Sequence, residues 1–219
     1  MRVLVISDLH APYHHPRAFR FLRMMRRKYK TDCTVCIGDE ADAHAWSRWG
    51  KSPGAKGAGD ELTATRAALR ELMRFDDTIQ FCTSNHVARA YKQIAELGVP
   101  GEFVRPWNEV LDAPVGWTWA DSVYVDGVRY FHGDGYGGAQ VQRNAAFDTR
   151  GNVVLGHVHT AAGVQYHSTG SSVIWGMSVG CLIDFRCPVY DYARKHRQTP
   201  IIGCGVVLNG VPHFEPMGD

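Results

Sequence analysis

The chain has 219 residues, 45% of them hydrophobic, and a formal net charge of +2. That length can bury a full hydrophobic core, so a single domain over residues 1–219 is expected. The small charge gives no support by itself for a nucleic-acid-binding protein. No apolar run approaches the roughly 18 residues of a membrane span, and the N-terminus does not resemble a signal peptide. We therefore expect a cytoplasmic protein with no membrane partner and with its six cysteines reduced.

The first predicted strand, residues 3–6, is short, apolar and rich in β-branched residues, which is typical of a strand buried on both faces. Asp8 and His10 follow it. Along an extended chain these two side chains point the same way, while Leu9 points back. A carboxylate and an imidazole then meet just past the carboxyl end of a strand, where open α/β sheets place their ligands. The sequence predicts a metal site here, completed by the ends of later strands.

A basic helix is predicted over residues 17–29, followed by Lys30. Its arginines and lysines fit either a solvated helix face or a surface that follows phosphates. The Gly-rich stretch 50–60 predicts a flexible surface loop, and it lacks the G-x-x-x-x-G-K-[ST] pattern of a nucleotide-binding loop. Further helices are expected over residues 61–74 and 87–97.

Strands dominate the later part of the chain. Alternating residues 117–125 and 128–131 flank Asp126-Gly127, which predicts a hairpin. A short helix is expected near residues 144–149. Other strands are expected at 34–37, 78–82, 152–155, 163–166, 172–175 and 201–208, with Asn209-Gly210 as a last hairpin turn. Early alternation of strands and helices followed by strands predicts an α/β fold with a two-layered sheet core and helices outside.

Residue types that bind metals follow five of the predicted strands. They are Asp8 and His10, Asp39, Asn85 and His86, His132, and His157 and His159. A lone histidine at a strand end is more often structural, but five such ends in one chain indicate a shared site. Mixed imidazole and carboxylate ligands suit Mn, Fe, Zn, Ni or Co rather than calcium or an iron–sulfur cluster. The number of ligands fits two metal ions that share a carboxylate.

The order D-x-H, G-D, N-H, H and G-H-x-H, from residue 8 to residue 159, resembles the calcineurin-like metallophosphoesterase family, especially its small uncapped bacterial and phage members. The resemblance implies a four-layer αββα sandwich, with two mixed sheets flanked by helices. It also implies a role for each site residue: Asp8, His10 and His159 on the first metal, Asn85, His132 and His157 on the second, Asp39 as the bridge, and His86 as the catalytic or substrate-orienting histidine.

The chain departs from the family pattern in two places. The family motif G-N-H-[ED] reads S-N-H-V from residue 84. Ser84 is expected to leave Asn85 in place if its backbone angles are ordinary, and Val87 removes an acidic residue that could orient neighbouring groups. The family also often has a polar residue a few positions after G-D. Asp42 or His44 could fill that role, and either could equally be a surface residue.

These features predict a phosphoester hydrolase that depends on two divalent metal ions, with manganese favoured. Two metals clamp the oxygens of an in-line displacement at phosphorus and lower the pKa of a bridging water, which attacks as hydroxide. A protonated His86 could stabilise the developing charge or protonate the leaving oxygen. Without a large cap, an open cleft slightly favours phosphodiesters. Candidate substrate contacts are Arg89, His14 and His44, and His15, Trp46 and Trp49 are candidate cleft residues.

Three alternatives stay open. The chain could be a phosphomonoesterase, a DNA or RNA nuclease that uses the basic helix over residues 17–30, or a non-catalytic metal-binding scaffold. A retromer subunit with this fold is such a scaffold, but it has lost ligand histidines, and the ligand set here is complete. The expected partner is a phosphate-ester substrate, with nucleotides and nucleic acids included. Aromatic residues in 166–175 and 182–192 leave open whether the protein forms a dimer.

Overall fold

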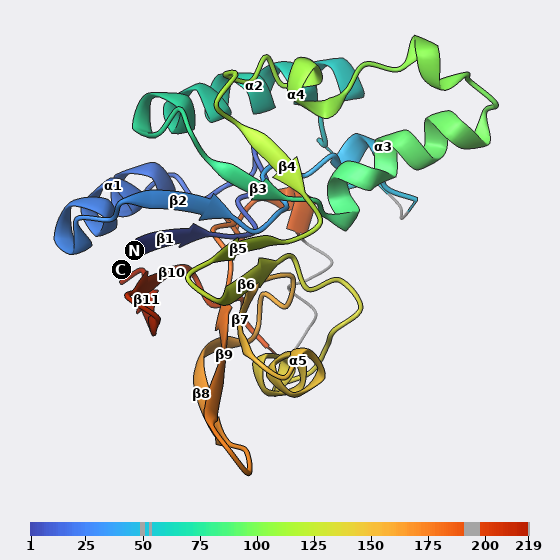
Figure 1. Cartoon of the computed structure of the whole chain (residues 1–219). Coiled ribbons are helices and arrows are strands. Elements are labelled where there is room, and N and C mark those ends of the chain that lie inside the picture. The colour runs from blue at the N-terminus through green and yellow to red at the C-terminus, as the bar shows by residue number, and fades with distance from the viewer. Residues whose placement is uncertain (49–50, 53, 191–197, 219) are drawn as a thin grey trace.

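A computed structural model describes residues 1–48, 51–52, 54–190 and 198–218. Two β-sheets pack face to face, and helices cover their outer sides (Figure 1). The six-stranded sheet contains β1 (Arg2–Ile6), β2 (Cys33–Cys36), β3 (Gln80–Cys82), β4 (Thr118–Ala120), β10 (Gly203–Leu208) and β11 (Val211–Pro216). The five-stranded sheet contains β5 (Val123–Val125), β6 (Val128–Phe131), β7 (Asn152–Leu155), β8 (Ala162–Ser168) and β9 (Val173–Val179).

The helices are α1 (Ala18–Tyr29), α2 (Ala58–Phe75), α3 (Asn85–Glu96), α4 (Trp107–Val110) and α5 (Val141–Thr149). Three short 3-10 turns are η1 (His44–Trp46), η2 (Gly101–Phe103) and η3 (Pro188–Tyr190). The strand orders are β11-β10-β1-β2-β3-β4 and β5-β6-β7-β9-β8. Each sheet mixes parallel and antiparallel pairs, with β1, β2 and β3 parallel in one and β6, β7 and β9 parallel in the other.

Three apolar layers hold this sandwich together, and β1 contributes to two of them. Val3 and Val5 face the second sheet, whereas Leu4 and Ile6 face α1 and α2. This split follows from the two-residue period of a strand, and it requires the strand to be apolar on both faces. A third cluster packs α5 against the outer face of the second sheet. The α/β class and the two mixed sheets flanked by helices were both predicted correctly.

One predicted strand is in fact two. Residues 117–125 form β4, which pairs with β3 in the first sheet, and β5, which pairs with β6 in the second. The alternation of apolar residues continues through the crossing because each short strand is half-buried against a different partner. The hairpin turn itself is confirmed, since Asp126 and Gly127 both have positive φ (49° and 77°), as a tight two-residue turn requires.

Three helices begin earlier than predicted, and one of them is α5, which starts at Val141 instead of near residue 144. Helix α2 starts at Ala58, so the end of the predicted 50–60 loop is helical; Asp60 and Glu61 place negative charge in its first turn, which favours a helix N-terminus. Trp49, Gly50 and Pro53 lie outside the described residues. Helix α3 starts at Asn85 after an extended Ser84. The six cysteines are free, as predicted, and no helix in the described part of the chain is long and apolar enough to span a membrane.

Candidate metal centre

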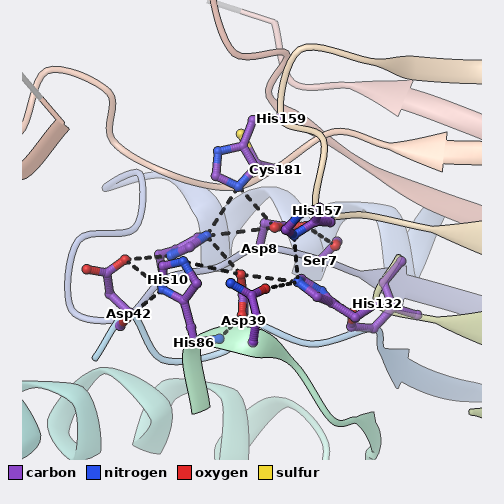
Figure 2. Close-up of polar contacts among 12 residues, drawn as sticks. Ser7, Asp8, His10, Asp39, Asp42, His86, His132, His157, His159 and Cys181 are labelled. Atoms are coloured by element: carbon purple, nitrogen blue, oxygen red, sulfur yellow. Dashed lines mark hydrogen bonds and ion pairs between the residues drawn. The ribbon is translucent and has the colours of Figure 1, made fainter. Parts of the chain in front are cut away.

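Six candidate ligands gather where the strands of the two sheets end (Figure 2), and the seventh, Asn85, lies against His132. The parallel strands β1, β2 and β3 of the first sheet and β6 and β7 of the second deliver their following loops to the same place. Asp8 and His10 follow β1, Asp39 follows β2, Asn85 opens α3, His132 follows β6, and His157 and His159 follow β7. The convergence is therefore a consequence of topology, as expected for the carboxyl ends of neighbouring parallel strands.

The backbone at these ligands is not extended. Asp8, His10, Asp39 and His157 have φ values of 49°, 51°, 51° and 65°, in the left-handed region that residues other than glycine rarely adopt. Asp8 and His10 do reach the same cluster, and Leu9 is buried on the helix side of the first sheet. The directions were predicted correctly, but the reason given, an extended chain, was wrong. Strain of this kind persists at functional sites because the surrounding structure enforces it.

The glycines of the G-D and G-H-x-H motifs allow the two sheets to approach here. Gly38 has φ 97°, and a Cβ on it would lie 2.8 Å from His132 Nδ1. A Cβ on Gly156 would collide with the side chains of Ser7 and Asp8. Any larger residue at either position would push candidate ligands apart, so these glycines are part of the site's construction.

Asp39 lies between two sets of donor atoms. Its Oδ2 atom is 3.6 Å from His10 Nε2 on one side and 3.3 Å from His132 Nε2 on the other. In the first set, His159 Nε2 is 3.0 Å from Asp8 Oδ1 and 3.2 Å from His10 Nε2. This is the arrangement expected if one carboxylate is shared by two neighbouring cation sites.

The second set is equally compact. His132 Nε2 lies 2.9 Å from Asn85 Oδ1 and 3.2 Å from His157 Nδ1. The donors of Asp39, His132 and His157 all lie within 4.8 Å of one another, as do those of Asp8, His10 and His159. Ser84, which stands where the resembled motif has glycine, has φ −144° and ψ 163°. These ordinary extended angles meet the condition set for Asn85 to stay in place.

Hydrogen bonds on the side away from the cluster orient two of the buried imidazoles. His10 Nδ1 donates to Asp42 Oδ1 at 2.6 Å, and His132 Nδ1 donates to the carbonyl of Ile37 at 3.0 Å. Each histidine therefore carries its proton on Nδ1 and turns Nε2 toward the cluster, which is how histidines that bind metals are usually held. Asp42 is buried, so it is an orienting residue and not a surface residue.

The cluster concentrates negative charge. Burial by itself raises the pKa of a carboxyl, yet the surrounding histidines hold the pKa values of Asp8 and Asp39 below their ordinary range. Burial lowers the pKa of His10, but Asp42 and Asp8 outweigh it and raise that pKa to about 10. The pKa of His132 rises to about 9 in spite of burial, chiefly through Asp39. In the described part of the chain, histidines rather than lysines or arginines face these carboxylates.

This donor set fits divalent cations. Buried carboxylates need compensating positive charge, and imidazole nitrogens that point inward beside carboxylate oxygens match the ligands of first-row transition metals. A site that is ready to bind a cation needs buried carboxylates and histidines with Nε2 turned inward, and both are present. Bound metal replaces the protons on such histidines.

His86 lies at the edge of the cluster, on the first turn of α3. Its backbone N–H is 3.3 Å from Asp39 Oδ1, its Nδ1 is 2.6 Å from the carbonyl oxygen of Asp42, and its Nε2 is 2.6 Å from Arg89 Nη2. A carbonyl can only accept and a guanidinium can only donate. These contacts therefore describe an imidazole that donates from Nδ1 and accepts at Nε2.

The three residues predicted to contact the substrate lie in different surroundings from one another. Arg89 is one helical turn from His86 and contacts it, so it lies at the cluster. His44 is buried, with Nδ1 3.8 Å from Asp42 Oδ2, behind the ligands. The ring of His14 packs on Phe19 with centroids 4.8 Å apart. Neither of these two histidines belongs to the groups of converging donors found in the described chain.

Sequence reasoning missed Glu40, which follows Asp39. It is fully buried, and its Oε1 accepts hydrogen bonds from Trp107 Nε1 at 2.7 Å and Trp119 Nε1 at 3.0 Å. These indoles tie the loop after β2 to α4 and β4. The only local signal is an acidic residue beside the G-D motif, and the partners are far away along the chain.

Comparisons with known proteins give a likeness of fold. No family model matches the chain, and no curated protein matches it in sequence. Among solved structures, Yfce, a phosphoesterase from E. coli, is 14% identical with a TM-score of 0.49, over 95% of this chain and 89% of that one. Vps29 from Cryptosporidium parvum is 11% identical with a TM-score of 0.44, over 99% of this chain and 96% of that one. A single-substitution variant of Vps29 from Entamoeba histolytica is 14% identical with a TM-score of 0.42, over 99% and 98%. At these identities and scores the neighbours carry no conclusion about activity.

Proposed function

We propose that this chain is a calcineurin-like metallophosphoesterase that uses two divalent metal ions, with manganese favoured, to hydrolyse phosphate esters. The observation that carries the proposal is the position of Asp39, whose Oδ2 atom lies within 3.6 Å of imidazole nitrogens from both ligand sets. A single metal site would not need a carboxylate between two complete groups of donors. Two bound ions would supply Lewis acidity toward the phosphoryl oxygens and acidify a water molecule.

The chain's own residues would divide the remaining work. Asp8, His10 and His159 would hold one ion, and Asn85, His132 and His157 the other, as the family resemblance implies. Asp42 keeps His10 in the required tautomer and accepts a contact from His86. The first turn of α3 points its backbone N–H at Asp39, which fixes the orientation of the shared carboxylate.

His86 and Arg89 would act on the substrate. The guanidinium of Arg89 is a permanent cation beside the cluster, suited to a phosphoryl oxygen. When that guanidinium contacts substrate, the released Nε2 of His86 would take a proton from water and pass it to the leaving oxygen, while Nδ1 stays bound to the Asp42 carbonyl. We propose a phosphodiester as the slightly preferred substrate, with phosphomonoesters and nucleic acids as the alternatives.

The test is hydrolysis by metal-stripped protein of a generic phosphodiester and the matching monoester, with and without added manganese. We expect diester hydrolysis that depends on manganese and a stoichiometry of two ions per chain. Activity on the monoester alone would replace the diester proposal with a phosphatase. Two bound ions without hydrolysis of either ester would favour the non-catalytic scaffold, and hydrolysis that survives removal of all metal would reject the mechanism.

A further inference from the structure

An apolar cavity of about 570 Å³ opens beside the metal cluster. Its walls come from η1, α2, α3 and the segment that runs through η2 and α4. The larger apolar side chains that line it are Trp46, Leu62, Tyr91, Ile94, Phe103 and Trp107, and the charged residues Glu61 and Arg105 also line it. The volume lies within the range of roughly 300–1,000 Å³ typical of small-molecule sites, which are also mostly apolar.

One wall of this cavity is the apolar face of α3. Ala90, Tyr91 and Ile94 follow helical spacing on that face, and every residue of the helix is at least partly exposed. Phe103, on the opposite wall, is 80% exposed. Aromatic and aliphatic side chains that converge in this way without filling the space between them form a hollow that an apolar group can occupy.

The cavity is separated from the cluster by few residues. Ala41 and Ala43, which line it, flank Asp42 in the chain. Trp46 forms a wall common to this cavity and to a second hollow of about 320 Å³, which is also lined by Asn85 and Arg89. Trp107 is bonded to Glu40, the residue after Asp39. A substrate that occupies both the cluster and the cavity would have to pass the side chain of Trp46, which both hollows share.

The charges of the two hollows specify that molecule. Arg89 and Lys92 line the hollow that contains Asn85, which suits an anionic group, whereas four aromatic rings line the neighbouring cavity. We infer that the substrate is a phosphate ester of an aromatic alcohol, with the phosphoryl group at the cluster and the aromatic group in the cavity. This inference rests on the proposed function. Planar rings pack well between tryptophan and tyrosine side chains.

Phosphonates test this inference without turnover, because their P–C bond is not hydrolysed. We would measure by calorimetry the dissociation constants of methyl-, phenyl- and 1-naphthylphosphonate for the manganese-loaded protein. The constant should fall by about tenfold or more from methyl to naphthyl, from the apolar area buried. Ile94→Asp should abolish this gain. Leu97→Asp is the matched control, since Leu97 ends the same helix, is 79% exposed and does not line the cavity.

A second variant keeps the inference testable if Ile94→Asp fails to fold. Ala90→Leu adds no charge and fills part of the cavity, so it should weaken naphthylphosphonate binding while methylphosphonate binding stays unchanged. Equal constants for the three phosphonates, or a gain that survives Ile94→Asp, would overturn the inference. So would a dimer that Ile94→Asp dissociates, since a second copy would then cover the face. The phosphonate ranking together with no hydrolysis of any ester would instead count against the proposed function alone.

Discussion

Helices α1 and α3 both carry basic side chains, but the structure gives those charges different surroundings. On α1, Arg23 pairs with Glu71, Arg26 with Asp76, and Lys28 with Glu215, so these cations tie the helix to α2 and β11. On α3, Arg89 contacts His86, and Lys92 lines a hollow with Asn85. In the more basic helix, three of the five cations pair with acidic neighbours. The number of charges in a segment therefore says less about phosphate binding than what those charges face.

The largest expected effect lies where the N-terminus of α3 meets Asp39. Asp39→Asn keeps the shape of the side chain and tolerates the positive φ, because asparagine adopts that region readily. The amide lacks the charge that two cations share, so we expect hydrolysis to fall by about a thousandfold or more. Metal analysis of the purified variant should show weaker binding of both ions. Full turnover with two ions bound would remove Asp39 as the shared ligand.

The second-largest loss of activity is expected for a substitution in the first turn of α3. His86→Ala should lower turnover by about a hundredfold to ten-thousandfold, the usual contribution of a positioned acid or base. The metal stoichiometry should remain at the wild-type value, because both ligand sets are complete without His86. The measurement matters since the imidazole lies within 4.8 Å of donors on His10 and Asp39. Loss of an ion on substitution would make His86 a ligand.

A direct test of the two helices pairs Arg89→Gln with Arg23→Gln. The first removes a cation that contacts His86, and we expect kcat/KM to fall by about a hundredfold to a thousandfold, as for loss of one preorganised donor. The second removes a cation that is 42% exposed and paired on the surface with Glu71, and it should leave kcat/KM unchanged because such pairs contribute little. Equal losses in both variants would show that α1 also contacts the substrate.

The sequence predicts the candidate ligands better than it predicts the residues that orient them. Each strand end is a local pattern, an apolar run followed by a ligand residue, so Asp8, Asp39 and His132 could be found one at a time. Their convergence then follows from parallel strands. The orienting role of Asp42 could not be separated from that of His44, because the choice depends on which carboxylate faces the buried Nδ1 of His10.

The fold was predicted to the level of its layers, and the errors have local causes. The start of α3 was placed two residues late because Asn85 and His86 were assigned to a loop, although Ser84 is a residue type that often precedes helices. The crossing between β4 and β5 was missed because apolar alternation does not reveal which sheet a strand joins. The cavity was also invisible in the sequence, since its walls come from distant segments.

The smallest effect on activity, and the clearest on stability, is expected at the other helix. Asp76 is buried between α1, α2 and β2, where its carboxylate accepts hydrogen bonds from Thr34 at 2.7 Å and from Arg26 and Thr78. Burial raises its pKa, but these bonds outweigh burial and hold the pKa below the ordinary value of 3.8. Asp76→Asn should lower the free energy of unfolding by about 1–3 kcal/mol, measured by urea denaturation, with hydrolysis unchanged at 25 °C.

The stability difference between wild type and Asp76→Asn should depend on pH. A carboxyl whose pKa is depressed in the folded state stabilises the protein above its unfolded pKa, and the contribution is lost as the pH falls toward the folded value. The difference between wild type and Asp76→Asn should therefore be constant from pH 7 down to about 5 and shrink below pH 3.8. A difference that persists at pH 2.5 would mean that the hydrogen-bond geometry of Asp76, and not its charge, holds α1 against the sheet. The cations of α1 would then lose the structural role that separates them from those of α3.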